Sequence, residues 1–585
     1  MNKQRGPAMT GAAIVIDTLL REGADVVFGY PGGKVIPIFD LINKSGRLRF
    51  VLTRHEQAAA HAADGYARAT GKVGVCLVTS GPGATNTITG IATAKSDSIP
   101  VVFISGQVST AEIGSDAFQE ADVAGLARPI CKHNYTVTSI QELPQVLKDA
   151  FHLARTGRPG PVAVDLPVDV STALLDPYVY PDSPPPPARK TQTKGHSERM
   201  KKLAEAVGRA EKPLVLAGGG VITSGAEEEL SRFLRKTNIP AAMTLMGLGC
   251  LPKDMPLNLG MAGMHGMPAA NLAIMECDLL IGIGTRFDDR ITSDPKAFAP
   301  KALIAHVDID AAEIGKHVHT DLAVVGDARA VLAELTEKLA PRPAGTWNAK
   351  VGEWNERYTL RYKQEPDGRI LPQSVIDAVN EAAAPGTIFV TDVGQNQMWA
   401  ALLLKHGGPR SFISSGGMGT MGFGLPAAMG AWLGRPDRQI ICISGDGGIQ
   451  MNIQELATCS LNRIPVKIVV MNNSCLGMVR QWQELYWNAN YSKTCLKENA
   501  GCSEKCRESE GLCQNAYWPD LVGVARANGM PGLRAERPSE ILPVLKEGLA
   551  MKGPVLMEFI VDKYANIFPM GSLGKPLNHI IFGRT

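Results

Sequence analysis

The C-terminal third of the chain contains the stretch IICISGDGGIQMNIQELATCSLNRIPVKIVVMNN, from Ile440 to Asn473. One apolar, β-branched run in it ends in Gly445-Asp446-Gly447, and a second ends in Asn472-Asn473. Between the two runs lies an amphipathic stretch, residues 453–461, with the apolar spacing of a helix. Because right-handed crossovers join parallel strands, the stretch predicts two neighbouring parallel strands of an open α/β sheet.

Asp446 and Asn473 are therefore expected side by side at the carboxyl ends of these strands, where open α/β sheets bind ligands. Their carboxylate and amide oxygens suit Mg²⁺, a hard cation that is often shared with phosphate groups. Glycine lets a diphosphate approach the backbone closely, and three glycines adjoin the aspartate: Gly445, Gly447 and Gly448. This arrangement resembles the GDG…NN signature of thiamine-diphosphate enzymes, which implies thiamine diphosphate and Mg²⁺ as cofactors.

Length and composition limit the class of protein. At 585 residues the chain is too long for one core, so roughly two to four domains are expected. A formal net charge of +3 gives no electrostatic case for a nucleic-acid or membrane partner. No apolar run approaches the roughly 18 residues of a membrane span, and Asp17 interrupts the apolar N-terminal segment, unlike a signal peptide. A cytoplasmic location is expected.

Strand-like runs alternate with Ala-rich helical stretches in three blocks. The predicted domains are residues 1–180, 197–340 and 368–565, and a Pro-rich polar linker separates the first two. The predicted fold class is α/β, with three doubly wound parallel-sheet domains. This layout resembles the thiamine-diphosphate decarboxylase and carboligase family. The resemblance implies a pyrimidine-binding domain, a central FAD-binding domain and a domain that binds the diphosphate and Mg²⁺.

Glu56 stands at the start of an Ala-rich helical stretch in the first block. A Glu in the first turn of a helix is most often a partner of the helix dipole. The resemblance implies instead that Glu56 is catalytic, because the matching Glu of the family protonates the aminopyrimidine ring of the cofactor. The family binds this cofactor between two chains, so Glu56 is expected to serve the diphosphate site of a partner subunit.

The third block carries further segments that resemble the family's cofactor site. Asn396 stands where related enzymes usually have His, so an amide replaces a ring that can carry charge. Met421 matches the bulky residue that bends the cofactor, although a Met is more often core filler. Cys475 matches the position whose backbone carbonyl binds the metal. The other implied cofactor contacts in this block are Val393, Gly394, Gln395, Gly419 and Met478.

Four segments resemble the acetolactate synthase family in particular: one is the turn at residues 80–86, and the other three carry predicted site residues. The backbone amide of Gly33, in a Tyr-Pro-Gly-Gly turn, is implied to stabilise an oxyanion on the reacting keto group. Gln119 lies in a segment that matches the active-site channel and is implied to be catalytic. Trp482 is implied to favour 2-ketobutyrate as the acceptor, whereas a lone Trp is usually a packing residue.

The central block resembles the FAD site of anabolic members of that family. Arg286 and Arg290 stand four residues apart, so on a helix their side chains would lie on one face. Either they bind a pyrophosphate, or they form a surface network of ion pairs with neighbouring Asp side chains. Asp308 and Asp327 end or follow strands, where acidic residues commonly bind ribose hydroxyls. The remaining implied FAD contacts are Arg158, Gly219, Gly220, Thr244, Leu245 and His265.

The implied reaction is the decarboxylation of pyruvate and the transfer of its two-carbon unit to a second 2-keto acid. The resemblance also implies a homodimer or dimer of dimers, with the active site at the interface, and a separate regulatory small subunit. Two alternatives stay open. One is another carboligase or lyase of the family, such as sulfoacetaldehyde acetyltransferase or pyruvate oxidase. The other is an inactive cofactor-binding scaffold, against which Glu56, Asp446 and Asn473 argue.

A Cys-rich segment departs from the family pattern. Cys495, Cys502, Cys506 and Cys513 crowd into a polar stretch that is longer than usual for the family. Four thiols there allow a zinc or iron–sulfur site, a disulfide or redox-responsive loop, or a plain solvated insertion. The spacing contains no CxxC pair, so these three interpretations remain open.

Overall fold

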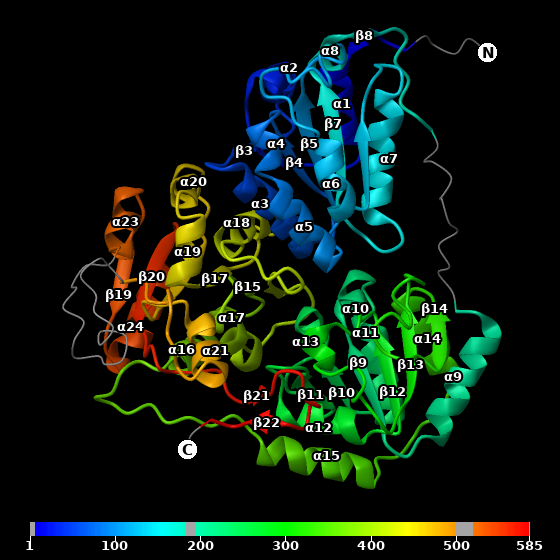
Figure 1. The fold of residues 1–585 in the computed structure, drawn as a ribbon, viewed down its shortest axis with the longest axis vertical. Coiled ribbons are helices and arrows are strands. Elements are labelled where there is room, and N and C mark those ends of the chain that lie inside the picture. Colours follow the sequence, from blue (N-terminus) through cyan, green and yellow to red (C-terminus); the bar gives the residue numbers. More distant parts are fainter. Residues whose placement is uncertain (1–5, 183–194, 498–518, 584–585) are drawn as a thin grey trace.

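The computed structural model describes residues 6–182, 195–497 and 519–583, and within these ranges the chain forms three six-stranded parallel sheets (Figure 1). Helices lie on both faces of each sheet, so the predicted α/β fold with three doubly wound sheets is confirmed. Two antiparallel pairs of short strands accompany the large sheets: β1 (Met9–Thr10) with β8 (Leu174–Leu175), and β21 (Met570–Gly571) with β22 (Ile580–Ile581).

The first sheet has the strand order β3-β2-β4-β5-β7-β6. Its central strands are short, β-branched and buried, as expected of a parallel sheet that is covered on both faces. The strands are β2 (Val26–Tyr30), β3 (Arg49–Leu52), β4 (Gly74–Val78), β5 (Val101–Gln107), β6 (His133–Thr136) and β7 (Val162–Pro167). The helices are α1 (Gly11–Arg21), α2 (Ile36–Ser45), α3 (Glu56–Thr70), α4 (Pro82–Thr85), α5 (Ile88–Asp97), α6 (Val123–Ala127), α7 (Leu143–Arg155) and α8 (Val168–Thr172).

The central sheet has a different order, β11-β10-β9-β12-β13-β14. This is the order of dinucleotide-binding sheets, whose ligands bind where the strand order reverses, here between β9 and β12. The strands are β9 (Pro213–Ala217), β10 (Ala241–Met243), β11 (Asn258–Met261), β12 (Leu279–Ile283), β13 (Leu303–Asp308) and β14 (Leu322–Val325). The helices are α9 (Ser197–Arg209), α10 (Gly219–Thr223), α11 (Glu227–Thr237), α12 (Pro268–Glu276), α13 (Asp289–Thr292), α14 (Ala328–Lys338) and α15 (Thr346–Arg357).

The third sheet, β16-β15-β17-β18-β20-β19, repeats the strand order of the first. Its order reverses between β15 and β17, which predicts a ligand site at their carboxyl ends. The strands are β15 (Ile388–Thr391), β16 (Phe412–Ile413), β17 (Ile440–Gly445), β18 (Lys467–Asn472), β19 (Gly532–Ala535) and β20 (Val555–Ile560). The helices are α16 (Pro372–Ala382), α17 (Gln395–Leu403), α18 (Gly424–Gly434), α19 (Asp446–Met451), α20 (Glu455–Leu461), α21 (Gly477–Tyr486), α23 (Leu521–Ala527) and α24 (Ile541–Ala550).

The segment 440–473 forms the predicted parallel pair, with Ile441 opposite Lys467 and Gly445 opposite Met471. The connection differs in detail from the single helix expected at 453–461. A short extra helix, α19, begins at Asp446 directly after β17. An acidic residue in the first turn is favoured by the helix dipole, which explains why the helix starts at this carboxylate.

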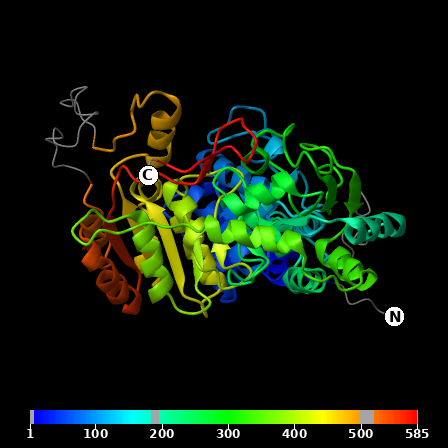
Figure 2. The same cartoon turned by 90° about the horizontal axis from the view of Figure 1, so that it is seen from below.

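The first and third sheets contact each other through α3 and α18, which lie side by side in Figures 1 and 2. The two helices approach backbone to backbone at glycines. A Cβ on Gly65 would stand 2.2 Å from the carbonyl oxygen of Ala427, and one on Gly430 would stand 1.8 Å from that of Ala62. The closeness of this contact therefore depends on residues without side chains.

The C-terminal segment crosses from the third sheet to the central one (Figure 1). The N–H of Gly571, in β21, donates to the carbonyl oxygen of Met264 over 2.6 Å. Among the described residues, no helix is both long enough and apolar enough to cross a membrane.

Candidate functional site

The first group of predicted site residues lies where the order of the third sheet reverses. Asp392 directly follows β15, is buried, and accepts hydrogen bonds from the N–H groups of Gly422 at 3.0 Å and Gly424 at 2.9 Å. Burial raises the pKa of Asp392, and these donors oppose the rise. Asp392 thus ties the loop that contains Gly419 and Met421 to the strand ends. Asp392 is not among the residues that the resemblance implied for the site, although it directly precedes Val393 and Gly394, which are.

Asp446 and Asn473 come together as predicted. Asp446 is 5% exposed, and its carboxylate accepts hydrogen bonds from backbone N–H groups that include those of Asn473 and Ser474. Burial raises the pKa of Asp446 to about 7. The N–H of Cys475 donates to Oδ1 of Asn473 over 3.1 Å, so these two residues belong to one turn. Asp446 accepts the backbone N–H of Asn473 in that turn, and the three predicted metal-binding residues therefore lie together.

This donor set fits Mg²⁺ better than a transition metal. The described residues contain no group of three or more His, Cys, Asp or Glu side chains that could hold a metal ion. A cation at Asp446 therefore relies on one carboxylate together with amide and backbone oxygens, which is the ligand chemistry of a hard divalent ion. Burial raises the pKa of the Cys475 thiol to about 12, and a neutral thiol is a poor ligand.

The backbone around Asp446 requires glycine at two positions. A Cβ on Gly448 would stand 2.3 Å from Oδ1 of Asp392, and Gly394 has φ of 140°, a conformation that favours glycine. Nδ2 of Asn396 donates to the backbone carbonyls of Asp392 at 3.2 Å and Ile443 at 3.1 Å. Asn396 therefore braces the two strand ends against each other.

The other predicted residues of this domain surround the same turn. Oε1 of Gln395 accepts a hydrogen bond from Nδ2 of Asn473 over 3.4 Å, while its Nε2 donates to Gln481. A Cβ built on Gly447 would lie 3.5 Å from Cε of Met421. The Met421 side chain therefore ends beside the Gly-Asp-Gly turn.

A second group lies at the carboxyl edge of the first sheet. Oε2 of Glu56 accepts a hydrogen bond from Nδ2 of Asn86 over 2.9 Å. A Cβ on Gly83 would stand 3.6 Å from Oε1 of Glu56, and one on Gly81 would stand 2.8 Å from the carbonyl oxygen of Gln119. Gly33 begins the short helical turn after β2. The structure thus brings Glu56 and Gln119 to one turn, residues 80–86.

Glu455 connects this group to the third domain. Its Oε1 accepts the N–H of Arg54 over 2.9 Å, two residues before Glu56, and its Oε2 accepts the hydroxyl of Thr458 over 2.6 Å. The side chain is fully buried, and burial raises its pKa to about 7. Sequence reasoning missed Glu455, because nothing local in the chain signals a partner some 401 positions away.

A cavity of about 590 Å³ lies where the three domains meet, a volume typical of ligand pockets. Its lining includes Gly219 and Gly284, just after β9 and β12, the two strands between which the order of the central sheet reverses. Every residue predicted for FAD lines it: Arg158, Gly219, Gly220, Thr244, Leu245, His265, Arg286, Arg290, Asp308 and Asp327. Five residues predicted for the thiamine site or the substrate line it as well: Val393, Gly394, Gly419, Met478 and Trp482.

Two buried polar atoms in this cavity have no hydrogen-bond partner among the described residues: Nδ1 of His265 and Nε1 of Trp482. Buried polar groups normally have partners, so both atoms point to a bound ligand. Burial lowers the pKa of His265 to about 4, so the ring is neutral at pH 7. The cavity and its unpartnered atoms fit a large mixed polar and aromatic group such as FAD.

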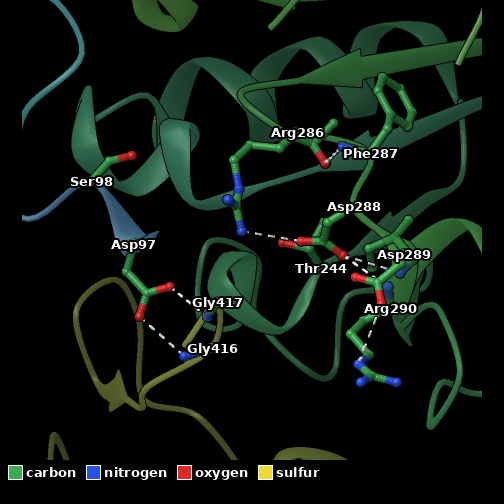
Figure 3. Close-up of polar contacts among 12 residues, drawn as sticks. Asp97, Ser98, Thr244, Arg286, Phe287, Asp288, Asp289, Arg290, Gly416 and Gly417 are labelled. Carbon is green, nitrogen blue, oxygen red and sulfur yellow. Dashed lines mark hydrogen bonds and ion pairs between the residues drawn. The ribbon is translucent and has the colours of Figure 1, made fainter. Parts of the chain in front are cut away.

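The three arginines predicted for FAD differ in the partners that their side chains contact. Figure 3 shows Nη2 of Arg286 directed at Oδ2 of Asp288, 3.4 Å away. The Arg290 guanidinium lies 5.8 Å from the centre of the Trp482 ring, a cation–π contact. Arg158 forms ion pairs with Asp310 and Glu313. These arginines line the cavity with positive charge, which suits a pyrophosphate.

The acidic residues of the cavity wall have structural partners too. Asp327 caps α14 by accepting the N–H groups of Arg329 and Ala330. Burial raises the pKa of Asp308 to about 6. Asp97 was not predicted and joins two domains at this wall: its carboxylate accepts the N–H groups of Gly417 at 2.7 Å and Gly416 at 3.0 Å (Figure 3).

Of the four clustered cysteines, the structure describes Cys495, an exposed free thiol. Cys502, Cys506 and Cys513 lie outside the described residues, so the three interpretations of that cluster remain predictions. Seven further cysteines are buried free thiols: Cys76, Cys131, Cys250, Cys277, Cys442, Cys459 and Cys475.

Comparison with known proteins agrees with this geometry. The thiamine pyrophosphate enzyme family matches the chain in three parts: the N-terminal TPP binding domain at residues 9–126, the central domain at 200–335 and the C-terminal TPP binding domain at 392–559. An acetolactate synthase of Mycobacterium bovis is 46% identical over 97% of this chain and 90% of its own length. A probable acetolactate synthase large subunit of Methanocaldococcus jannaschii is 47% identical over 98% of this chain and 95% of its own. The acetolactate synthase large subunit of Haemophilus influenzae is 42% identical over 98% of both. The chain therefore belongs to the acetolactate synthase large subunits of the thiamine pyrophosphate enzyme family.

Proposed function

We propose that this acetolactate synthase chain decarboxylates pyruvate and transfers the two-carbon unit to a second 2-keto acid, pyruvate or 2-ketobutyrate, in branched-chain amino-acid biosynthesis. The observation that carries the proposal is the buried Asp446 carboxylate beside Asn473 at the strand ends, in a chain similar to acetolactate synthases over nearly its full length. Bound thiamine diphosphate would supply an acidic thiazolium carbon that, once deprotonated, adds to a keto group.

The residues of the third domain would hold the diphosphate. Asp446, the amide of Asn473 and the backbone carbonyl of Cys475 supply oxygen ligands for Mg²⁺. The glycines at 394 and 445–448 let the diphosphate oxygens come close to backbone N–H groups. Met421, at the edge of the same turn, would support the bent form of the cofactor.

The residues of the first domain would move the proton and stabilise charge. Glu56 would exchange a proton with the pyrimidine ring, and its bond from Asn86 orients the carboxyl for that task. The N–H of Gly33 would stabilise negative charge on the oxygen of the reacting keto group. Gln119 lies against the same turn as Glu56 and would line the approach of the second keto acid.

FAD would bind in the cavity at the central sheet. Gly219 and Gly220 begin α10 at the reversal point, Arg286 and Arg290 offer positive charge to the pyrophosphate, and His265 offers an unpartnered ring nitrogen. Because carboligation involves no net oxidation, the flavin would have a structural role. Trp482 lies between this cavity and the thiamine residues, and it would select the acceptor by filling space beside the larger side chain of 2-ketobutyrate.

The active site would be completed by a second copy of the chain. The Glu56 carboxylate accepts its described hydrogen bond from Asn86 of its own domain. Glu56 lies at the edge of the first sheet, whereas Asp446 lies at the edge of the third. We therefore infer a homodimer, or a dimer of dimers, in which Glu56 meets the diphosphate site of a partner. Two of the relatives are named large subunits, which supports a separate small subunit as regulatory partner.

The test is an assay of the purified chain with thiamine diphosphate, Mg²⁺ and pyruvate. Acetolactate should form, and 2-aceto-2-hydroxybutyrate should form when 2-ketobutyrate is added. Glu56→Gln should lower kcat by about 10²–10⁴-fold while leaving the Kd for thiamine diphosphate unchanged, because the amide cannot exchange the proton. Turnover of sulfoacetaldehyde, or formation of acetyl phosphate, without acetolactate would overturn the proposal. Full activity of Glu56→Gln would refute the proton transfer.

A further inference from the structure

Cys475 and Cys495 face each other at the base of the segment that carries α21. The two residues form an isolated antiparallel bridge. The hydrogen bonds of the bridge flank the cysteines: Leu476 N–H to Thr494 O at 2.8 Å, and Leu496 N–H to Ser474 O at 2.9 Å. The cysteines therefore occupy a non-hydrogen-bonded position of the ladder, where Cα atoms lie only about 4.5 Å apart and the side chains project to the same face.

This position suits a covalent link between the two residues. Disulfides require Cα atoms about 4.4–6.8 Å apart, and a non-hydrogen-bonded pair meets that condition without movement of the backbone. Both thiols are free.

The two thiols differ in access to solvent. Cys475 is 7% exposed, whereas Cys495 is exposed. An external reagent therefore reaches Cys495 first, and the buried thiol stands behind it as the resolving partner.

We propose that Cys475 and Cys495 are a modification site, a thiol pair that a small-molecule disulfide converts to a reversible disulfide bond. The Cys495 thiolate attacks the small disulfide, forms a mixed disulfide and releases one small thiolate. The Cys475 sulfur then attacks the Cys495 sulfur as its proton passes to solvent, and it displaces the second small thiolate. The protein loses two protons and two electrons, and the small disulfide is reduced to two thiols.

The bond would close the segment 475–495 at its base. This segment carries Met478 and Trp482 to the cavity, and its first residue donates its N–H to Asn473. Oxidation would therefore restrict opening of the chain next to the metal-binding turn, without altering the turn itself.

The test uses the full-length chain treated with oxidised glutathione at mildly alkaline pH, alkylated, digested and mapped by mass spectrometry. We expect a peptide that links Cys475 to Cys495. Limited proteolysis within 475–495 should slow by about tenfold or more, since a disulfide restricts opening of the loop it closes. A dithiol reductant should reverse both effects.

Three variants serve as controls. Cys475→Ser and Cys495→Ser should each lose the link and the protection, while their proteolysis under reducing conditions should match that of the parent. The triple variant Cys502→Ser, Cys506→Ser, Cys513→Ser should retain both the link and the protection. A link from Cys495 to any of those three residues, or a stable glutathione adduct on Cys495 with Cys475 still alkylated, would overturn the proposal. Acetolactate formation by the reduced enzyme reports on the proposed function separately.

Discussion

Replacing Glu455 with Gln should change the pH dependence of stability in a way that the structure specifies. Glu455 is fully buried and accepts hydrogen bonds from the N–H of Arg54 and the hydroxyl of Thr458. In Glu455→Gln the amide oxygen can keep the bond from the backbone, and the amide NH₂ can donate to the Thr458 hydroxyl, which is able to accept. The substitution thus keeps the contacts and removes the charge.

The size of the effect on the free energy of unfolding follows from the pKa shift of Glu455. Burial raises the pKa of Glu455 from 4.5 to about 7, which corresponds to about 3 kcal/mol of free energy. Because the folded state holds this proton more tightly than the unfolded state, the stabilisation is complete below pH 4.5 and is lost as the pH rises through 7. The Gln side chain carries no charge, so the variant does not lose this stability as the pH rises. At pH 8 the Tm of the variant should therefore lie about 2–3 °C above that of the parent, for a chain of this size that unfolds as one unit.

The assay is thermal melting of the parent and Glu455→Gln at pH 5 and pH 8. The two Tm values should agree at pH 5, and the variant should melt higher at pH 8. Glu381→Gln is the matched control, because Glu381 is an exposed residue paired with Lys546, and its Tm difference from the parent should be small at both pH values. A Tm difference for Glu455→Gln that is the same at pH 5 and pH 8 would refute the assignment of a buried, charge-penalised carboxyl.

Three other tests, with four substitutions, probe the site and the packing. Asp446→Asn should raise the Mg²⁺ concentration for half-maximal activity by about tenfold or more, measured after removal of metal by a chelator, and unchanged Mg²⁺ dependence would exclude Asp446 as a ligand. Gly65→Ala should lower Tm, because its Cβ would stand 2.2 Å from the carbonyl oxygen of Ala427. Gly208→Ala is the control: its Cβ would have no atom within 4 Å, and it should stabilise helix α9 by about 0.5–1 kcal/mol. Equal changes of Tm in the two variants would contradict the packing of α3 against α18. Trp482→Leu should reduce the preference for 2-ketobutyrate over pyruvate by about 10-fold or more in a competition assay, and an unchanged product ratio would remove Trp482 from the acceptor site.

The parts of the fold that were predictable are those with local signals. The β-branched runs that end at Asp446 and Asn473 predicted a parallel pair, and the pair is there. The residues of the cavity wall were implied by the resemblance to a known family, which rests on local motifs such as Gly-rich turns after strands. The helix that starts at Asp446 was not expected, since two glycines follow it and glycine disfavours helices in isolation.

Long-range contacts explain what was missed. Glu455 and Asp97 each accept backbone N–H groups from another domain, and neither stands in a pattern that announces this. The bridge between Cys475 and Cys495 depends on the register of one residue pair, which no periodicity encodes. Such contacts follow from how the domains meet, and a single sequence contains no signal for that.

The contact between α3 and α18 has a reciprocal form. Gly65 of one helix meets Ala427 of the other, and Gly430 meets Ala62, so on each helix the glycine stands one turn after the alanine. Both helices also hold the same place in sheets of identical strand order, between the second and third strands in the chain. Each helix thus offers its glycine to the alanine of the other helix. A contact whose two halves are equivalent in this way has the form found across a twofold axis. The two outer domains of this chain therefore meet through equivalent faces of α3 and α18, as two copies in a symmetric dimer would.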